Sequence, residues 1–222
     1  EALFAAGGMH GDLALAEELG ARVHLQHLSS ACSVDMVRQA KRRGVAVTAE
    51  ATPHHLILAD EDIPSADANY KMNPPLGTPQ DREALRQALV DGTVDCVATD
   101  HAPHTAAAKA KGFASAPFGV IGMETALAAL WTELVVPGRV TALALIERMS
   151  AGPARAFGLE AGTLTPGARA DVTIFDPKAE WVVDPDKFLS KSRNCPFAGR
   201  RLMGKVVRTL VGGDTRFAAE GR

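Results

Sequence analysis

The chain has 222 residues, 46% hydrophobic and 23% charged, and its 24 Lys and Arg against 26 Asp and Glu give a formal net charge of −2. This length suffices for a sizeable hydrophobic core, and the balanced charge provides no field that would favour nucleic acid as a partner. The three cysteines are odd in number and widely spaced, and apolar runs stay short, so the sequence predicts a cytoplasmic location and no membrane partner.

The first part of the chain alternates predicted helices and strands. Hydrophobic spacing and glycine or serine boundaries define each element. In chain order we predict helices at residues 1–6 and 12–19 separated by Gly7-Gly8, a strand at 23–28, a helix at 30–43, strands at 45–49 and 94–98 flanking a helix at 79–90, and helices at 123–134 and 141–149. Such alternation is typical of right-handed βαβ units, whose chemistry gathers at the carboxyl ends of the strands.

The character of the sequence changes after residue 158. Residues 160–183 and 204–217 are rich in Val, Thr and Ile and are interrupted by turn signals such as Gly212-Gly213. We therefore predict two units, residues 1–158 and a small β domain at residues 159–222.

Two residues at predicted strand ends could bind a metal ion. His27 ends a buried apolar strand, where an imidazole is either a hydrogen-bonded core residue or a ligand. Asp100 leaves another such strand, and a carboxylate there is costly unless it is paired, caps a helix or binds a cation. Imidazole and carboxylate both suit Zn²⁺. Strand alternation places His24 on the face opposite His27, so we interpret His24 as structural.

Other polar residues have two readings each. His54 and His55 favour a structural role in fixing their loop over a ligand role. Asn73, which precedes two prolines, could be a rigid hydrogen-bonding group for a substrate or only part of a turn. Phe118 and Gly119 could let the backbone approach a ligand closely or could form a surface connection.

Five segments carry a resemblance to a known family. They are residues 24–30, residues 50–56, Asn73-Pro74-Pro75-Leu76, residues 95–104 and Asn194-Cys195-Pro196-Phe197. Together they resemble the bacterial type I dihydroorotases of the amidohydrolase superfamily. The order Thr-Asp-His-Ala-Pro-His at residues 99–104 is the most specific feature.

The resemblance implies an α/β fold, namely the C-terminal part of a (β/α)₈ TIM-like barrel with a small β-sandwich appendage. It implies a zinc-dependent cyclic amidohydrolase that converts N-carbamoyl-L-aspartate reversibly to L-dihydroorotate in pyrimidine biosynthesis, acting as a homodimer. The alternatives are an allantoinase or hydantoinase acting on another cyclic ureide, and a non-catalytic dihydroorotase-like subunit that scaffolds aspartate transcarbamoylase.

The resemblance also assigns roles to single residues. His27 matches a zinc ligand, and Asp100 matches a second ligand that also acts as the catalytic acid and base. The matches to substrate contacts are Asn73, His104, Phe118 and Gly119. The remaining ligands for one or two zinc ions, and the segment that completes the β domain, are expected before Glu1, and a longer connection is expected between His10 and Gly11.

Overall fold

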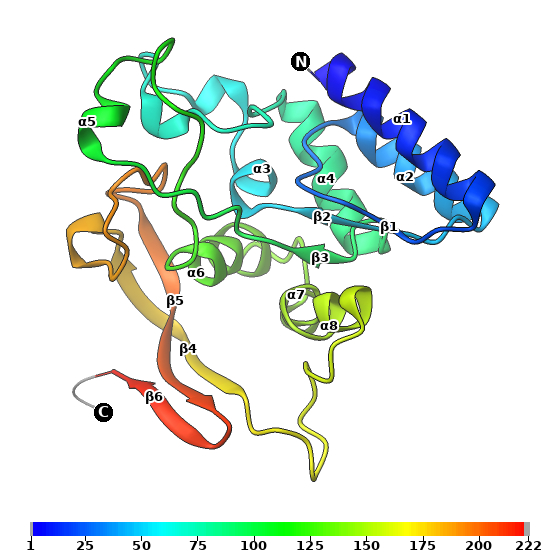
Figure 1. The fold of residues 1–222 in the computed structure, drawn as a ribbon. Helices are drawn as coiled ribbons and strands as arrows, with labels where there is room; N and C mark the ends of the chain where they lie inside the picture. Colours follow the sequence, from blue (N-terminus) through cyan, green and yellow to red (C-terminus); the bar gives the residue numbers. More distant parts are fainter. Residues whose placement is uncertain (1, 220–222) are drawn as a thin grey trace.

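The computed structural model describes residues 2–219, and its elements follow the predicted alternation of helix and strand (Figure 1). The first elements are α1 (Ala2–Leu19), β1 (Val23–Leu25), α2 (Ala31–Arg43), β2 (Val47–Ala51), α3 (Pro53–Ile57), α4 (Pro79–Asp91) and β3 (Cys96–Val97). The three strands form a parallel sheet in the order β1-β2-β3, which pairs Val23 with Val47 and Glu50 with Cys96. Parallel pairing places the carboxyl ends of the strands at one edge.

Helix α2 begins and ends where its local sequence predicts. The Ser30 side chain accepts a hydrogen bond from the Ser33 backbone N–H at 3.1 Å and so caps the first turn. Gly44 adopts φ +86° and donates its backbone N–H to the carbonyls of Ala40 and Lys41, which closes the last turn. These caps are local interactions, so the sequence alone could locate them.

The prediction of two helices before β1 was wrong. Helix α1 runs from Ala2 to Leu19 without a break at Gly7-Gly8, and it passes continuously through His10 and Gly11. A glycine inside a helix costs only about 1 kcal/mol, and packing of an apolar face can outweigh that cost. Leu13 and Ala16 supply such a face, because both are buried in the core.

Two of the three parallel strands are shorter than predicted, and the third, predicted at residues 45–49, is shifted to Val47–Ala51. The predicted strand at residues 23–28 ends at Leu25, and the predicted strand at residues 94–98 is confined to Cys96–Val97. His27 has φ +52°, in the left-handed region, where an extended strand cannot continue. The local signal for this conformation is weak, because histidine is enriched among non-glycine residues at positive φ but still adopts it rarely.

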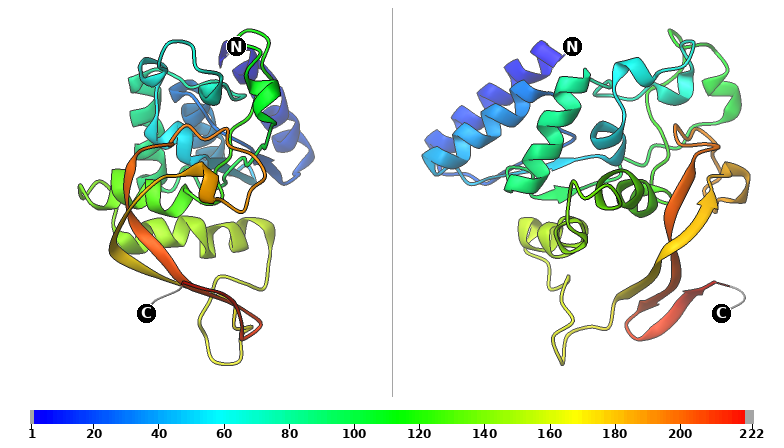
Figure 2. Two further views of the ribbon diagram at one scale, coloured as in Figure 1. Left: turned by 90° about the vertical axis from the view of Figure 1, so that its left-hand side faces the viewer. Right: turned by 180° about the vertical axis from the view of Figure 1, so that it is seen from behind.

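The middle of the chain connects the parallel sheet to a second sheet. Its helical segments are 3₁₀ turns at Asp60–Asp62 and Ala68–Tyr70 before α4, then α5 (Ala106–Lys109), α6 (Ala126–Leu130), a π-helical segment (Trp131–Val135), α7 (Ala142–Met149), α8 (Ala151–Phe157) and a 3₁₀ turn at Pro185–Lys187. Figures 1 and 2 show α7 and α8 on the side of the sheet away from α2. None of the described helices is long and apolar enough to cross a membrane.

The second sheet is antiparallel, with the order β4 (Val172–Val182), β5 (Arg201–Val211) and β6 (Asp214–Ala218). It extends away from the helices as a long ribbon (Figure 2). Gly212 and Gly213, at φ +59° and +89°, form the tight turn between β5 and β6, as the turn signal predicted. The described residues form one layer here, so the second layer of a β-sandwich stays a prediction.

The hydrophobic core draws on both parts of the chain. Leu85, Leu130 and Leu145 are buried together with Phe197 and Leu202, which flank the start of β5. The segment between β4 and β5 is therefore packed into the same core as the helices of the parallel sheet.

Candidate functional site

The carboxyl ends of β1 and β3 bring His27 and Asp100 together. His27 Nε2 lies 3.7 Å from Asp100 Oδ1, and both side chains are about three-quarters buried, at 24% and 23% exposed. A tetrahedral zinc ion with bonds of about 2.0–2.2 Å holds its ligand atoms about 3.3–3.6 Å apart. The spacing of these two atoms therefore fits one shared cation.

Both of these residues have left-handed backbones. His27 has φ +52° and Asp100 has φ +46°, and only Ser65 and Ala66 share this property among the described non-glycine residues. Such a conformation costs of order 1–3 kcal/mol and persists where the surroundings enforce it, commonly at functional sites. The backbone of both strand ends is thus bent at the residues whose side chains meet.

Glu50 of β2 contacts His27 from the other side. Its Oε1 lies 2.8 Å from His27 Nδ1 in an ion pair, and neither atom has an aligned hydrogen bond within residues 2–219. Burial alone would raise the pKa of Glu50, but its contacts with His27 and His24 outweigh burial and lower it. The contact with Glu50 likewise raises the pKa of His27 against the effect of burial. Glu50 therefore orients the ring and leaves Nε2 facing Asp100.

The placement of His24 on the opposite face from His27 was wrong. His24 Nε2 lies 3.1 Å from Glu50 Oε2, and its Nδ1 lies 2.8 Å from Thr48 Oγ1. Both imidazoles reach the same carboxylate because the left-handed backbone at His27 interrupts the strand alternation. His24 thus holds Glu50 in place, which agrees with a structural role.

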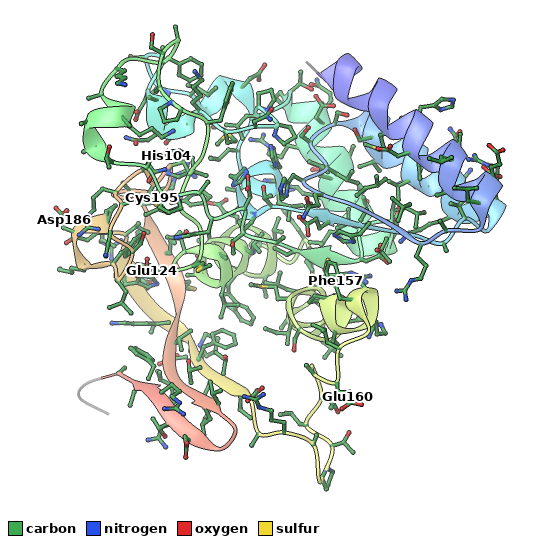
Figure 3. The ribbon with its side chains drawn as sticks, in the orientation of Figure 1. His104, Glu124, Phe157, Glu160, Asp186 and Cys195 are labelled. Carbon is green, nitrogen blue, oxygen red and sulfur yellow. The ribbon has the colours of Figure 1, made fainter. Side chains whose placement is uncertain are left out.

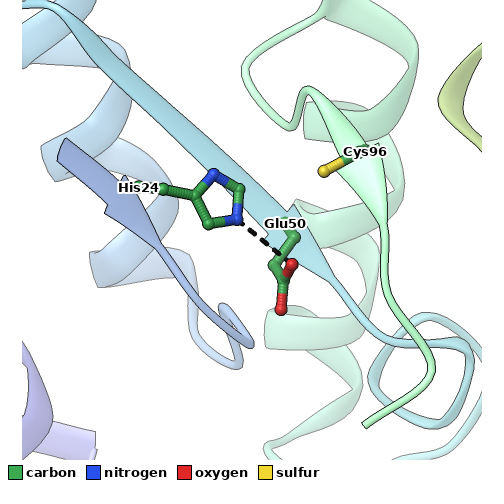
Figure 4. Close-up of side chains that lie close together, drawn as sticks. All are labelled: His24, Glu50 and Cys96. Carbon is green, nitrogen blue, oxygen red and sulfur yellow. Dashed lines mark hydrogen bonds and ion pairs between the residues drawn. The ribbon is translucent and has the colours of Figure 1, made fainter. Parts of the chain in front are cut away.

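Cys96 lies beside this carboxylate, so His24, Glu50 and Cys96 come from β1, β2 and β3 respectively (Figure 4). Their potential ligand atoms lie within 4.8 Å of one another and could hold a metal ion. Burial, with smaller contributions from Glu50 and Asp95, raises the pKa of the Cys96 thiol to about 12. A thiol must lose its proton to bind a metal, so the raised pKa of Cys96 disfavours metal binding by this group.

Helix α3 buries His54 and His55, each 2% exposed. His55 Nε2 donates to the Pro74 carbonyl at 3.0 Å, and its Nδ1 lies 2.8 Å from Thr52 Oγ1. Burial lowers the pKa of His55 to about 4, so the ring is neutral. His55 therefore fixes the loop that carries Asn73, in agreement with a structural role. His54 Nε2 has no hydrogen-bond partner within residues 2–219.

The loops after β3 bring three of the predicted substrate residues together. His104 Nε2 donates to the Phe118 carbonyl at 2.7 Å, and the Gly119 backbone N–H donates to the Lys71 carbonyl at 2.9 Å. Asn73, two residues beyond Lys71, is exposed, and its side chain makes none of the hydrogen bonds found within residues 2–219. The structure thus joins His104 to Phe118 and Gly119 but does not join Asn73 to them by a direct contact.

Sequence reasoning did not single out Glu50 and Asn194, whose contacts at the strand ends and loops appear only in the structure. Glu50 is the acidic residue inside an apolar strand, and a buried carboxylate needs a partner, so that signal was present. Asn194 belongs to a segment that carried the family resemblance, but its contacts with residues 102–119 depend on the tertiary fold.

The chain matches the model of the amidohydrolase family over residues 3–216. It is 54% identical over 202 residues to the dihydroorotase of Bacillus caldolyticus, a match that covers 91% of this chain and 47% of the relative. It is 52% identical over 209 residues to the dihydroorotase of Bacillus cereus strain AH820, covering 94% of this chain and 49% of the relative.

Solved structures of related enzymes have the same fold. An L-hydantoinase (dihydropyrimidinase) from Arthrobacter aurescens aligns with a TM-score of 0.89 and 31% identity over 95% of this chain and 48% of that chain. A dihydropyrimidinase from Brevibacillus agri aligns with a TM-score of 0.89 and 25% identity over 96% of this chain and 48% of that chain.

The family model matches almost the whole chain, and the α/β architecture agrees with it, so the chain belongs to the amidohydrolase family. This family is generally metal-dependent. The chain spans about half the length of the curated relatives it matches, which are named dihydroorotase.

Proposed function

We propose that the full-length protein is a zinc-dependent cyclic amidohydrolase that interconverts N-carbamoyl-L-aspartate and L-dihydroorotate. In this proposal residues 1–158 form the C-terminal portion of a (β/α)₈ barrel, and residues 159–222 belong to a small β domain. The identity of 52–54% to proteins named dihydroorotase supports the substrate. The observation that carries the proposal is the approach of His27 Nε2 to within 3.7 Å of Asp100 Oδ1 at the shared sheet edge.

His27 and Asp100 are the residues of this chain that would hold zinc. A bound zinc ion supplies an activated water and polarises the amide carbonyl that is attacked. Catalytic zinc sites commonly use three protein ligands, so these two residues account for part of the shell. Glu50 supports the fit, because its contact at Nδ1 of His27 leaves Nε2 as the ligand atom.

Asp100 also moves the proton in this proposal. Burial chiefly, with a contribution from Glu50, raises the pKa of Asp100 above its usual range, although His27 opposes the shift. A carboxyl group with a raised pKa accepts a proton more readily. Its free oxygen takes the proton of the attacking water and delivers it to the ring nitrogen that leaves.

Asn73, His104 and the backbone of Phe118 and Gly119 bind the substrate in this proposal. His104 Nε2 carries the ring proton and donates it in the hydrogen bond to the Phe118 carbonyl. The ring therefore has Nδ1 available as an acceptor for a substrate N–H. The backbone N–H of Gly119 is already used by Lys71, so its loop contributes shape and carbonyl groups.

The test is an assay of the zinc-loaded full-length protein with L-dihydroorotate. We expect Asp100→Ala to lower kcat by about 10²–10⁴-fold, as for loss of a general acid and base. Asp214→Ala, on the exposed strand β6, is the matched control and should retain activity. Retention of activity by Asp100→Ala would exclude the assigned role of this carboxylate.

Hydantoinase activity is the second candidate, favoured by structural neighbours named hydantoinase and dihydropyrimidinase. The same preparation should be assayed with hydantoin, dihydrouracil and allantoin. Turnover of one of these without turnover of dihydroorotate would replace the substrate but keep the reaction class. Failure to open any cyclic ureide would contradict the enzymatic proposal.

A further inference from the structure

Asn194 connects three segments that are far apart in the sequence. It lies in the segment between β4 and β5, and it is 3% exposed. Its Nδ2 donates to the carbonyls of Ala102 and Gly119, both at 3.0 Å, and its Oδ1 accepts the backbone N–H of His104 at 3.3 Å. The side chain thus uses its acceptor and both of its donors on the two loops that follow β3.

These contacts form part of a closed ring of interactions. The His104 side chain donates to the Phe118 carbonyl, and the next residue, Gly119, accepts from Asn194. The Asn194 backbone carbonyl also accepts the N–H of Ile121 at 3.0 Å. His104 is therefore held at two points, its backbone N–H and its side chain, and the backbone at residues 118–121 is held at three by these contacts. Figure 3 shows His104 beside Cys195, the residue that follows Asn194.

The loops approach each other closely at this ring. Gly119 has φ +133°, and a Cβ atom there would lie 2.6 Å from Ala102 Cβ and 3.0 Å from His104 Nε2. Such spacing leaves no room for a side chain at Gly119, so the backbone of one loop lies directly against the other. A buried amide that bridges both loops fixes their separation.

We propose that Asn194 is a positioning residue that sets the geometry of the substrate side of the site through His104 and Gly119. This inference rests on the proposed function, because the substrate roles of His104, Phe118 and Gly119 are part of that proposal. None of the side-chain hydrogen bonds of Asn194 within residues 2–219 goes to His27 or Asp100, so Asn194 acts on substrate binding and leaves metal binding unchanged.

The test uses Asn194→Asp and Asn194→Ala in the full-length protein. Asn194→Asp keeps the size and the acceptor but removes both donors and turns a carboxylate toward two carbonyls. We expect KM for dihydroorotate to rise about 10- to 100-fold, with kcat changed less than about threefold and zinc content unchanged, because binding contacts are lost and the metal pair is not. Gln39→Glu, the same amide-to-carboxylate change on the exposed face of α2, is the control and should not alter KM.

Hydrogen exchange separates this inference from the proposed function. Backbone amides of Ala102, His104 and residues 118–121 should exchange faster in both variants, whichever ureide the enzyme opens. Faster exchange in a protein that does not turn over dihydroorotate would support the positioning role while the proposed substrate fails. Unchanged exchange and unchanged KM would overturn the inference, and so would a loss of zinc parallel to the loss of activity.

Discussion

Glu50 illustrates how one buried carboxylate can serve two imidazoles. It stands at 4% exposure between His24 and His27, and its two oxygens each face one ring. A buried charge is tolerated only when it is paired, and here the pairing also selects the nitrogen that His27 presents to Asp100. The ion pairs that offset the free-energy cost of burying Glu50 thus also orient the ring of His27, a proposed ligand.

Glu50→Gln should weaken zinc binding. The amide keeps the size of the side chain but removes the charge that holds the His27 ring, and loss of such an outer partner typically costs about 10–100-fold in metal affinity. The measurement is competition for zinc between the full-length protein and a chelator.

Glu160→Gln is the control for this substitution, because Glu160 is exposed after α8, away from the parallel sheet (Figure 3). The zinc affinity of the Glu160→Gln variant should equal that of the wild type. If Glu50→Gln binds zinc as tightly as the control, then Glu50 does not orient the ligand.

At the scale of elements, Asp81 joins the first turns of two helices. Its Oδ2 accepts from the Thr78 backbone N–H and hydroxyl at 2.9 and 2.7 Å, which completes a capping box on α4. Its Oδ1 accepts the Ala31 backbone N–H at 2.8 Å, at the start of α2. Burial would raise the pKa of Asp81, but these hydrogen bonds outweigh burial and lower it.

Asp81→Asn should lower the free energy of unfolding by about 1–2 kcal/mol at neutral pH, through loss of a cap and of charge-assisted hydrogen bonds. Because the folded-state pKa of Asp81 is lowered, its contribution is present above the ordinary value of 3.8 and is lost as pH falls through the lowered pKa. Urea unfolding of both proteins should therefore show a difference at neutral pH that shrinks in acid.

Asp12→Asn, on the exposed face of α1, controls for the general effect of removing a carboxylate. It should leave the unfolding free energy nearly unchanged at either pH. An equal effect of Asp81→Asn at neutral and acidic pH would show that the cap acts through packing and not through its charge.

The elements that could be predicted from the sequence are those with local boundary signals. Ser30 and Gly44 define α2, and the turn glycines define the β5–β6 hairpin. The strand ends could not be predicted to the residue, because the left-handed backbone at His27 depends on its tertiary surroundings. The unbroken helix α1 was also missed, since packing outweighs the cost of its glycines.

The same division applies to the candidate site. His27 and Asp100 could be proposed from the cost of burying them and from the family resemblance, and the structure places them in contact distance. The contacts of Glu50 with His24 and His27 require the pairing of β2 with its neighbours. The hydrogen bond between Asn194 and His104 joins residues about 90 positions apart. Neither relation leaves a spacing pattern in the sequence.

At the scale of the whole molecule, the C-terminal part is anchored at one end and exposed at the other. Phe197 is 2% exposed and belongs to the main core, whereas Phe217 on β6 is 43% exposed. Phe197→Ala should therefore lower the free energy of unfolding of the full-length protein by about 3–5 kcal/mol. Phe217→Ala should change it by no more than about 1 kcal/mol.

Chemical denaturation of both variants checks this expectation. Equal and small effects would mean that the segment between β4 and β5 unfolds separately from the helices of the parallel sheet. A large effect of Phe217→Ala would show that β6 is covered by a part of the protein beyond residues 2–219.

The large sequence separation between Asn194 and its hydrogen-bond partners also sets the order in which parts of the site form during synthesis. A ribosome releases the parallel strands first, so His27 and Asp100 can meet while the later residues are still inside the exit tunnel. The two loops beyond β3 obtain their bridging amide only after residue 194 has emerged and folded back. A nascent chain arrested before that point would bring the two proposed ligands together while the proposed substrate side of the site still lacked its bridging amide.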